Sequence, residues 1–163
     1  MKIKKVVILS LALLLPVGVF LFLKGFGKNE FAVKPLYVNE TPPTLEGCDS
    51  IAKFPYLLPD SILSQYATGD DSLTVIFFGM LKGEAANQFK RVQQQLGGQG
   101  VSIVALKDTV QYLPMMRCVF FLQEPIDVVL FDKGGTIRGN YAGSDRDEID
   151  RLLTEVTIIQ KKY

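Results

Sequence analysis

The chain has 163 residues, enough for one domain beside a targeting segment, and 48% of them are hydrophobic, which suits a domain with a buried core. Five lysines precede the first acidic residue, Glu30, so the remainder carries 13 basic against 17 acidic residues, a net charge of −4. A slightly acidic domain lacks the positive charge that neutralises phosphates, which argues against binding to nucleic acid.

The first predicted element is a membrane anchor in residues 1–24. Lys2, Lys4 and Lys5 precede the uncharged segment 6–23, which as a helix at ~1.5 Å per residue nearly spans a hydrocarbon core of about 30 Å. The segment lacks the small-residue cleavage pattern of a signal peptide, so we expect an uncleaved helix in contact with membrane lipid. The basic residues before it predict a single pass through the cell (inner) membrane, with the rest of the chain extracytoplasmic, in the periplasm.

Residues 25–46 contain prolines and glycines and show no helical period, which predicts an extracytoplasmic linker. The domain is then expected to occupy residues 47–163. Near its start, residues 54–60 hold two prolines around apolar side chains, a pattern typical of an extended edge segment.

The most strongly patterned part of the domain is a strand that leads into an amphipathic helix. Leu73–Phe78 is apolar except for Thr74, which predicts a strand covered on both faces. The helix after it places one apolar stripe toward the sheet: Ala85, Phe89, Val92 and Leu96. Val101–Leu106 is a second predicted buried strand, and the spacing favours parallel pairing through a right-handed crossover.

The following segment has a weaker pattern. Asp108 or Thr109 is expected to cap a short helix, which Pro114 should break unless it starts a second one. Val128–Phe131 and residues 136–141 then read as two strands of a hairpin.

The last predicted element is a helix that follows Ser144, its expected cap. Its apolar stripe comprises Ile149, Leu152, Leu153, Val156 and either Ile159 or Gln160. Together the elements predict an α/β domain, a thioredoxin-like βαβ–ββα sandwich, with an N-terminal transmembrane helix.

The hairpin resembles that of the SCO/SenC proteins, which are membrane-anchored, thioredoxin-fold copper chaperones of cytochrome oxidase assembly. The matching motifs are Asp-x-x-Gly from Asp132, Arg-Gly-x-Tyr from Arg138, and Gly-Ser-Asp from Gly143. The anchor with its short linker and the strand that ends in Phe77 and Phe78 fit the same family. The resemblance implies the fold and an extracytoplasmic location.

The family's chemistry depends on a Cys-x-x-x-Cys after the first strand and on a histidine. The cysteines would fall near Leu81 and Ala85, and the chain has no histidine. We therefore assign no metal ligand, no catalytic residue and no cofactor. The corresponding turn is interpreted as a vestigial active site: Gly79, Met80, Leu81, Lys82, Gly83, Glu84 and Ala85. In that vacant turn, Met80 and Leu81 are expected to fold down against the hairpin.

Cys48 and Cys118 are the only thiols, and an even number in an oxidising compartment favours a structural disulfide. Two separate buried thiols, or a redox or metal role, are the alternatives. Met80, Met115 and Met116 are interpreted as gap-filling core residues, with a soft copper(I) cluster as the alternative.

Three functions stay open. The first is a non-catalytic module that binds a protein partner in the cell envelope, as in the assembly of a respiratory complex. The second is a thiol–disulfide or copper(I)-handling protein that uses Cys48 and Cys118. The third is an unrelated binding function in a groove around residues 79–83.

Overall fold

The structure is a computed structural model of the chain, and it describes residues 2–26, 32–48, 54–67 and 69–162. The chain divides into two compact units, Met1–Phe31 and Ala32–Tyr163.

The first unit contains α1, which spans Lys2–Phe26 and includes Pro16. The structure does not describe several side chains of the predicted anchor, those of residues 1–3, 6–11, 13 and 23. Within the described part of the chain, no helix is found that is both long and apolar enough to cross a membrane. The anchor therefore stays a prediction.

The second unit is built on one four-stranded mixed sheet with the order β2-β1-β3-β4. The strands are β1 (Leu73–Phe78), β2 (Val101–Leu106), β3 (Val128–Asp132) and β4 (Ile137–Tyr141). β1 pairs in parallel with β2 and antiparallel with β3, and β3 pairs antiparallel with β4. The predicted parallel strand–helix–strand half and the predicted hairpin are both confirmed.

The two central strands, β1 and β3, are the most buried, and every residue of β1 is buried as predicted. The prediction for β2 was wrong in one respect, because only its terminal residues, Val101 and Leu106, are buried and the four between them are half-buried. β2 is an edge strand with a neighbour on one side only, so fewer side chains cover it.

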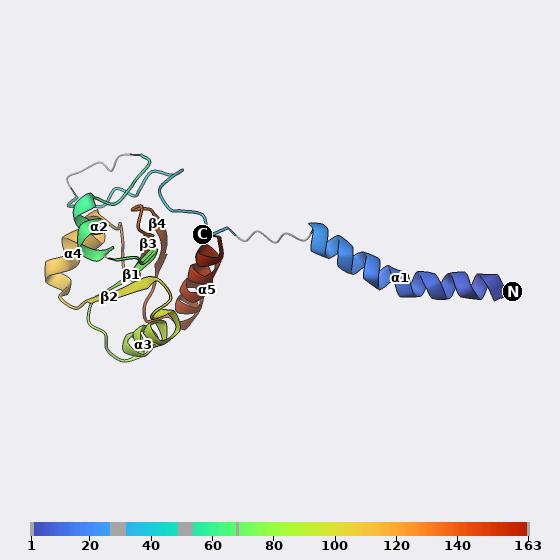
Figure 1. The fold of residues 1–163 in the computed structure, drawn as a ribbon. Coiled ribbons are helices and arrows are strands. Elements are labelled where there is room, and N and C mark those ends of the chain that lie inside the picture. The colour runs from blue at the N-terminus through green and yellow to red at the C-terminus, as the bar shows by residue number, and fades with distance from the viewer. Residues whose placement is uncertain (1, 27–31, 49–53, 68, 163) are drawn as a thin grey trace. The chain divides into compact units, whose positions relative to one another are not determined.

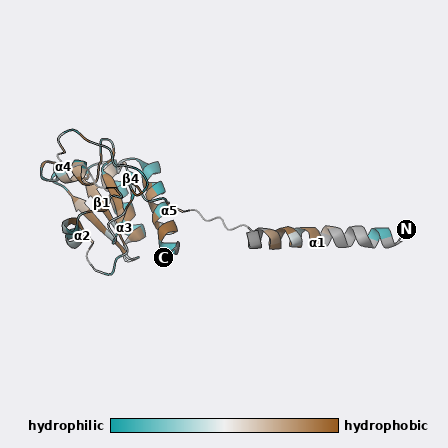
Figure 2. Cartoon of the chain, turned by 90° about the horizontal axis from the view of Figure 1, so that it is seen from above, coloured by the Kyte–Doolittle hydropathy of each residue, from teal (hydrophilic) through white to brown (hydrophobic). Residues whose placement is uncertain are grey.

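Helices cover both faces of the sheet, as Figure 1 shows. On one face α3 (Glu84–Leu96) and α5 (Arg146–Lys162) close a core that includes Val75, Leu130 and Ile149. On the other face α2 (Asp60–Tyr66) and the segment around α4 (Thr109–Cys118) close a second core. In Figure 2 the hydrophobic colour is concentrated on the strands between these helices.

Helix α2 was not predicted from the sequence. It has seven residues, and it buries Ile62 and Tyr66, which lie four residues apart on one side of the helix. The segment 54–60, predicted to be extended, has bends at residues 54 and 55 and enters α2 at Asp60, while residues 56–59 belong to no helix or strand. The Leu58 amide donates to the Gly135 carbonyl at 2.9 Å, which holds this segment against the hairpin turn.

The second unit begins at Ala32, so residues 32–46, which the sequence analysis assigned to the linker, belong to it. The Leu36 amide donates to the Ile137 carbonyl at 2.8 Å, and Leu45 is buried. We call residues 32–48 the N-terminal arm of the domain.

Helix α4 contradicts the prediction that Pro114 breaks it. Asp108 caps the helix as expected, because its side chain accepts hydrogen bonds from the Val110 and Gln111 amides. The helix then continues through Pro114 to Cys118. Proline has no amide to donate to the Val110 carbonyl, and Val110 is 84% exposed, so water can take that bond.

Helix α5 has Asp145, and not the predicted Ser144, as its cap. Asp145 Oδ1 accepts from the Asp147 amide at 2.8 Å and from the Glu148 amide at 3.5 Å. Asp145 directly precedes the first helical residue, which is the position from which a side chain reaches those amides. The predicted apolar stripe is confirmed, and Ile159 rather than Gln160 is its last buried member.

Candidate functional site

The turn after β1 borders an open pocket of about 640 Å³ at the end of the sheet where β1 finishes. Four of the seven predicted turn residues line it: Gly79, Met80, Leu81 and Ala85. The opposite wall comes from α4, through Leu113, Met116 and Arg117. The remaining lining residues are Phe78 and residues 122–127.

The two apolar side chains of the turn behave differently from each other. Met80 is 62% exposed, so the prediction that it folds down against the hairpin was wrong. Leu81 is half-buried and packs against the core beneath α3 and α5. Leu81 therefore reaches the core, whereas Met80 stays exposed and lines the pocket.

The other predicted turn residues lie at the start of α3. Lys82, Gly83 and Glu84 are exposed. Hydrogen bonds from the side chains of Gln88 and Asn87 lower the pKa of Glu84. This arrangement uses the carboxylate to stabilise the first turn of the helix, where a negative charge is favourable.

The pocket also contains charged residues of both signs: Arg117, Glu124 and Asp127. Asp127 Oδ1 accepts from the Gly143 amide at 2.5 Å, which ties the start of β3 to the chain after β4. Burial raises the pKa of the Asp127 carboxyl, and the bond from Gly143 only partly opposes this effect.

Cys48 and Cys118 form a disulfide, with Cα atoms 5.4 Å apart. The disulfide joins the N-terminal arm to the last residue of α4. Both cysteines are half-buried, and neither lines the pocket. Of the three interpretations of these cysteines, that of two separate thiols was wrong.

The hairpin motifs that carry the family resemblance hold the fold together. Asp132 accepts from the Gly134 and Thr136 amides within the turn, and its other oxygen accepts from Arg138 Nε at 2.8 Å. Gly135 has a φ of 81° and its carbonyl accepts from Leu58, so the turn also anchors the segment before α2.

Gly139 and Tyr141 form a second structural pair on one face of β4. A Cβ atom at position 139 would lie 2.1 Å from the Tyr141 hydroxyl oxygen and 2.5 Å from Cζ. The phenol ring therefore occupies the space above residue 139, which only glycine leaves open.

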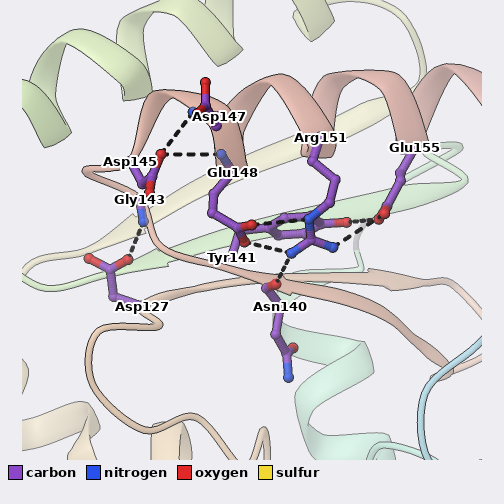
Figure 3. A network of polar contacts seen from close by, with 9 residues as sticks. All are labelled: Asp127, Asn140, Tyr141, Gly143, Asp145, Asp147, Glu148, Arg151 and Glu155. Atoms are coloured by element: carbon purple, nitrogen blue, oxygen red, sulfur yellow. Dashed lines mark hydrogen bonds and ion pairs between the residues drawn. The ribbon is translucent and has the colours of Figure 1, made fainter.

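A polar network fixes the Tyr141 ring between β4 and α5 (Figure 3). The hydroxyl donates to Glu155 Oε2 at 2.5 Å, and the Arg151 guanidinium lies 4.4 Å from the ring centroid. Arg151 also pairs with Glu148 and donates to the Asn140 carbonyl at 2.8 Å. Burial raises the pKa of Tyr141, and the bond to Glu155 raises it further.

A second cavity, of about 770 Å³, lies at the opposite end of the sheet. Its lining includes Ser72 and Asp132, with Gln160, whose side-chain amide donates to the Gln99 carbonyl at 2.5 Å. Asp132 and Arg138 pair with each other in its wall, so their charges are largely compensated.

Sequence reasoning found one wall of the first pocket and missed the other. Leu113 and residues 122–127 were not linked to the turn, because they follow it by about 30 or more residues and meet it only through the fold. Met116 was grouped with Met80 only in the alternative of a copper(I) cluster. Asp127 was the available signal, since it directly precedes a buried strand at the sheet end where functional residues gather.

Among the residues with described positions, no group of three or more histidine, cysteine, aspartate or glutamate side chains is placed to hold a metal ion. No known family model matches the chain, and a comparison with curated proteins finds no match.

Proposed function

We propose that this chain is a non-catalytic, thioredoxin-like binding module of the SCO/SenC type, which holds an apolar segment of a partner protein in the pocket between the turn and α4. In this proposal α1 anchors the module in the cell membrane and the domain faces the periplasm. The partner is a protein of the cell envelope, such as a component of a respiratory complex during assembly.

The sheet order and strand directions support the thioredoxin-like assignment. A parallel βαβ half and an antiparallel ββα half share one sheet, with helices on both faces. The lysines before residues 6–23 and the uncharged character of that segment support the anchor and its orientation.

The observation that carries the binding proposal is the exposed apolar rim of the pocket. Met80 is 62% exposed and Leu113 is 46% exposed, and they lie on opposite walls. Apolar side chains grouped around a concave site are typical of a surface that binds a partner. Arg117 and Glu124 at the same site can orient the bound segment through polar contacts.

The chemistry of the lining supports binding rather than catalysis. Leu81 and Ala85 stand where the family resemblance would put two cysteines, and the pocket lining contains no thiol or imidazole. A leucine and an alanine can supply contact surface but no nucleophile. The soft donors in the lining are the thioethers of Met80 and Met116, which come from the turn and from α4.

The test is a selection of short displayed peptides on the immobilised protein, followed by fluorescence anisotropy with the best binder. Leu113→Asp should weaken that peptide by roughly tenfold or more, because it puts a charge into the apolar wall. Val110→Asp is the matched control, since Val110 lies on the same helix, is 84% exposed and does not line the pocket. Equal weakening by both variants would exclude the pocket as the binding site.

The alternative of a thiol–disulfide enzyme that uses Cys48 and Cys118 has a direct assay. With dithiothreitol as electron donor, we expect the protein to reduce insulin no faster than the uncatalysed reaction. Turnover clearly above that background, lost in Cys48→Ser, would replace the binding proposal with the alternative. Copper(I) binding that the same substitution abolishes would have the same consequence.

A further inference from the structure

Helix α4 forms one wall of the pocket, and Cys118 is its last residue. Met116 and Arg117, which immediately precede Cys118, both line the pocket. Any movement at this end of the helix therefore changes the shape of the pocket.

Helix α4 packs on the second core only through half-buried side chains. None of its nine residues with a described side chain is fully buried: Tyr112, Met115 and Met116 are half-buried against the second core, whereas Val110, Leu113 and Pro114 are exposed. By contrast, α5 buries five apolar side chains against the sheet: Ile149, Leu152, Leu153, Val156 and Ile159. A helix that buries so little apolar surface opens locally at a low free-energy cost unless something else holds it.

The C-terminal end of α4 is attached to the N-terminal arm. The disulfide joins Cys118 to Cys48, and Arg117 Nη2 donates to the Glu46 carbonyl at 3.3 Å. Cys118 Sγ also lies 3.9 Å from the Gly47 carbonyl oxygen. These noncovalent contacts are long and exposed, so the covalent bond is the strongest element of the attachment.

We propose that the Cys48–Cys118 disulfide is a redox switch that sets the shape of the pocket through α4, an inference that rests on the proposed function. With the disulfide formed, α4 is held in place and the pocket is ready to bind. A dithiol reductant transfers two electrons and two protons to the bond, which leaves two cysteine thiols, while the reductant itself becomes a disulfide. The end of α4 is then released from the arm and is held only by its half-buried side chains and by the buried Phe120 and Leu122 that follow it, so this wall of the pocket moves more freely.

The position of the bond allows this exchange. Both cysteines are half-buried, and the flanking residues Glu46 and Gly47 are exposed. Thiol–disulfide exchange requires that a thiolate reach one sulfur, so an accessible bond is reduced more readily than one in the core.

Amide hydrogen exchange of the full-length protein in detergent, oxidised and reduced with a water-soluble phosphine, tests the proposal. On reduction, we expect the amides of residues 110–113 and 115–118 to exchange roughly tenfold faster or more relative to those of β3. The double variant Cys48→Ser, Cys118→Ser should match the reduced protein. Gly139→Ala is the control, because it destabilises the hairpin and leaves α4 and its disulfide in place.

The outcomes separate the switch from the binding function. If α4 exchanges equally fast relative to β3 in both redox states, or if Gly139→Ala reproduces the change, the switch is wrong. If α4 loosens on reduction and the selected peptide binds the reduced protein roughly tenfold less tightly, the switch is supported. If no peptide binds the oxidised protein, the proposed function fails and the exchange data alone decide whether the disulfide controls α4.

Discussion

Tyr141 and Gly139 show how one side chain determines the residue allowed two positions before it. The ring fills the space above Gly139 while its hydroxyl bonds Glu155, so an added methyl group has to displace the ring, the strand or α5. We expect Gly139→Ala to lower the free energy of unfolding by about 1–3 kcal/mol, the usual cost of overpacking. Urea denaturation of the two proteins measures this difference.

Gly134→Ala is the matched control for that substitution. Gly134 lies in the exposed turn of the same hairpin, and the nearest atom to an added Cβ is Asp132 Oδ1 at 3.2 Å. We expect a loss within about 0.5 kcal/mol, as for other surface substitutions. A loss as large as that of Gly139→Ala would mean that the hairpin is sensitive to any methyl group and that the tyrosine ring is not the cause.

Asp127 gives the site a pH dependence at the residue scale. Burial raises the pKa of its carboxyl, so between the unfolded and folded pKa values the folded state binds more protons than the unfolded state. The stability that this group contributes is therefore present at low pH and lost as the pH rises through the folded pKa.

Asp127→Asn removes that dependence and keeps an oxygen that accepts from the Gly143 amide. Relative to the unsubstituted protein, the variant should gain stability between about pH 4 and pH 7, by less than about 1 kcal/mol because the side chain is only partly buried. Urea denaturation at several pH values measures the difference, with Asp70→Asn in an exposed turn as the control. If the variant instead loses stability relative to the unsubstituted protein as the pH rises, the pKa of Asp127 is not raised by folding.

At the scale of the element, the start of α5 depends on which of two adjacent residues caps it. Asp145 accepts the bonds from the Asp147 and Glu148 amides, whereas Ser144 is exposed and precedes the capping position. We expect Asp145→Ala to cost about 1 kcal/mol, the typical value for a lost cap. Ser144→Ala should leave the thermal midpoint unchanged. A larger loss for Ser144→Ala than for Asp145→Ala would mean that Ser144 caps the helix, as the sequence predicted.

The elements predicted well from the sequence are those in which the spacing of apolar residues follows directly from the faces that are buried. β1 is apolar along its length because both faces are covered, and α5 shows its stripe because one side faces the sheet. Helix α2 has no clear pattern in the sequence, because its seven residues bury only Ile62 and Tyr66. The prediction that Pro114 breaks α4 was wrong, because Val110 one turn earlier is exposed and its carbonyl can bond water instead.

One wall of the candidate site could be predicted from a local pattern in the sequence, and the other wall could not. The turn after β1 follows from the rule that functional residues gather at the ends of such strands. The wall formed by Leu113 and Met116 depends on how α4 lies against the sheet, which no local pattern specifies. Met80 and Leu81 are adjacent and both apolar, and only the course of the turn decides that Leu81 reaches the core.

At the scale of the whole molecule, the boundary of the domain is the feature with the largest consequence. The N-terminal arm adds to both cores, because Val33 packs against the core that α3 and α5 close, while Leu36 and Tyr37 pack against the core on the opposite face of the sheet. Tyr37 also meets the ring of Phe121 edge-on, with centroids 5.3 Å apart. A proline-containing segment without a helical period thus contributes to the core through scattered side chains, which periodicity does not detect.

Two truncations test this boundary, one that begins at Ala32 and one that begins at Gly47. Both keep Cys48 and the disulfide, so they differ only in the arm residues 32–46. The shorter protein loses the buried side chain of Leu45, the packing of Val33 and the Leu36–Ile137 hydrogen bond. Because a fully buried aliphatic side chain contributes about 1.5–3 kcal/mol, we expect it to be less stable by about 2–4 kcal/mol in urea denaturation. Equal stability of the two proteins would mean that residues 32–46 are a linker after all, and that the domain starts at the disulfide.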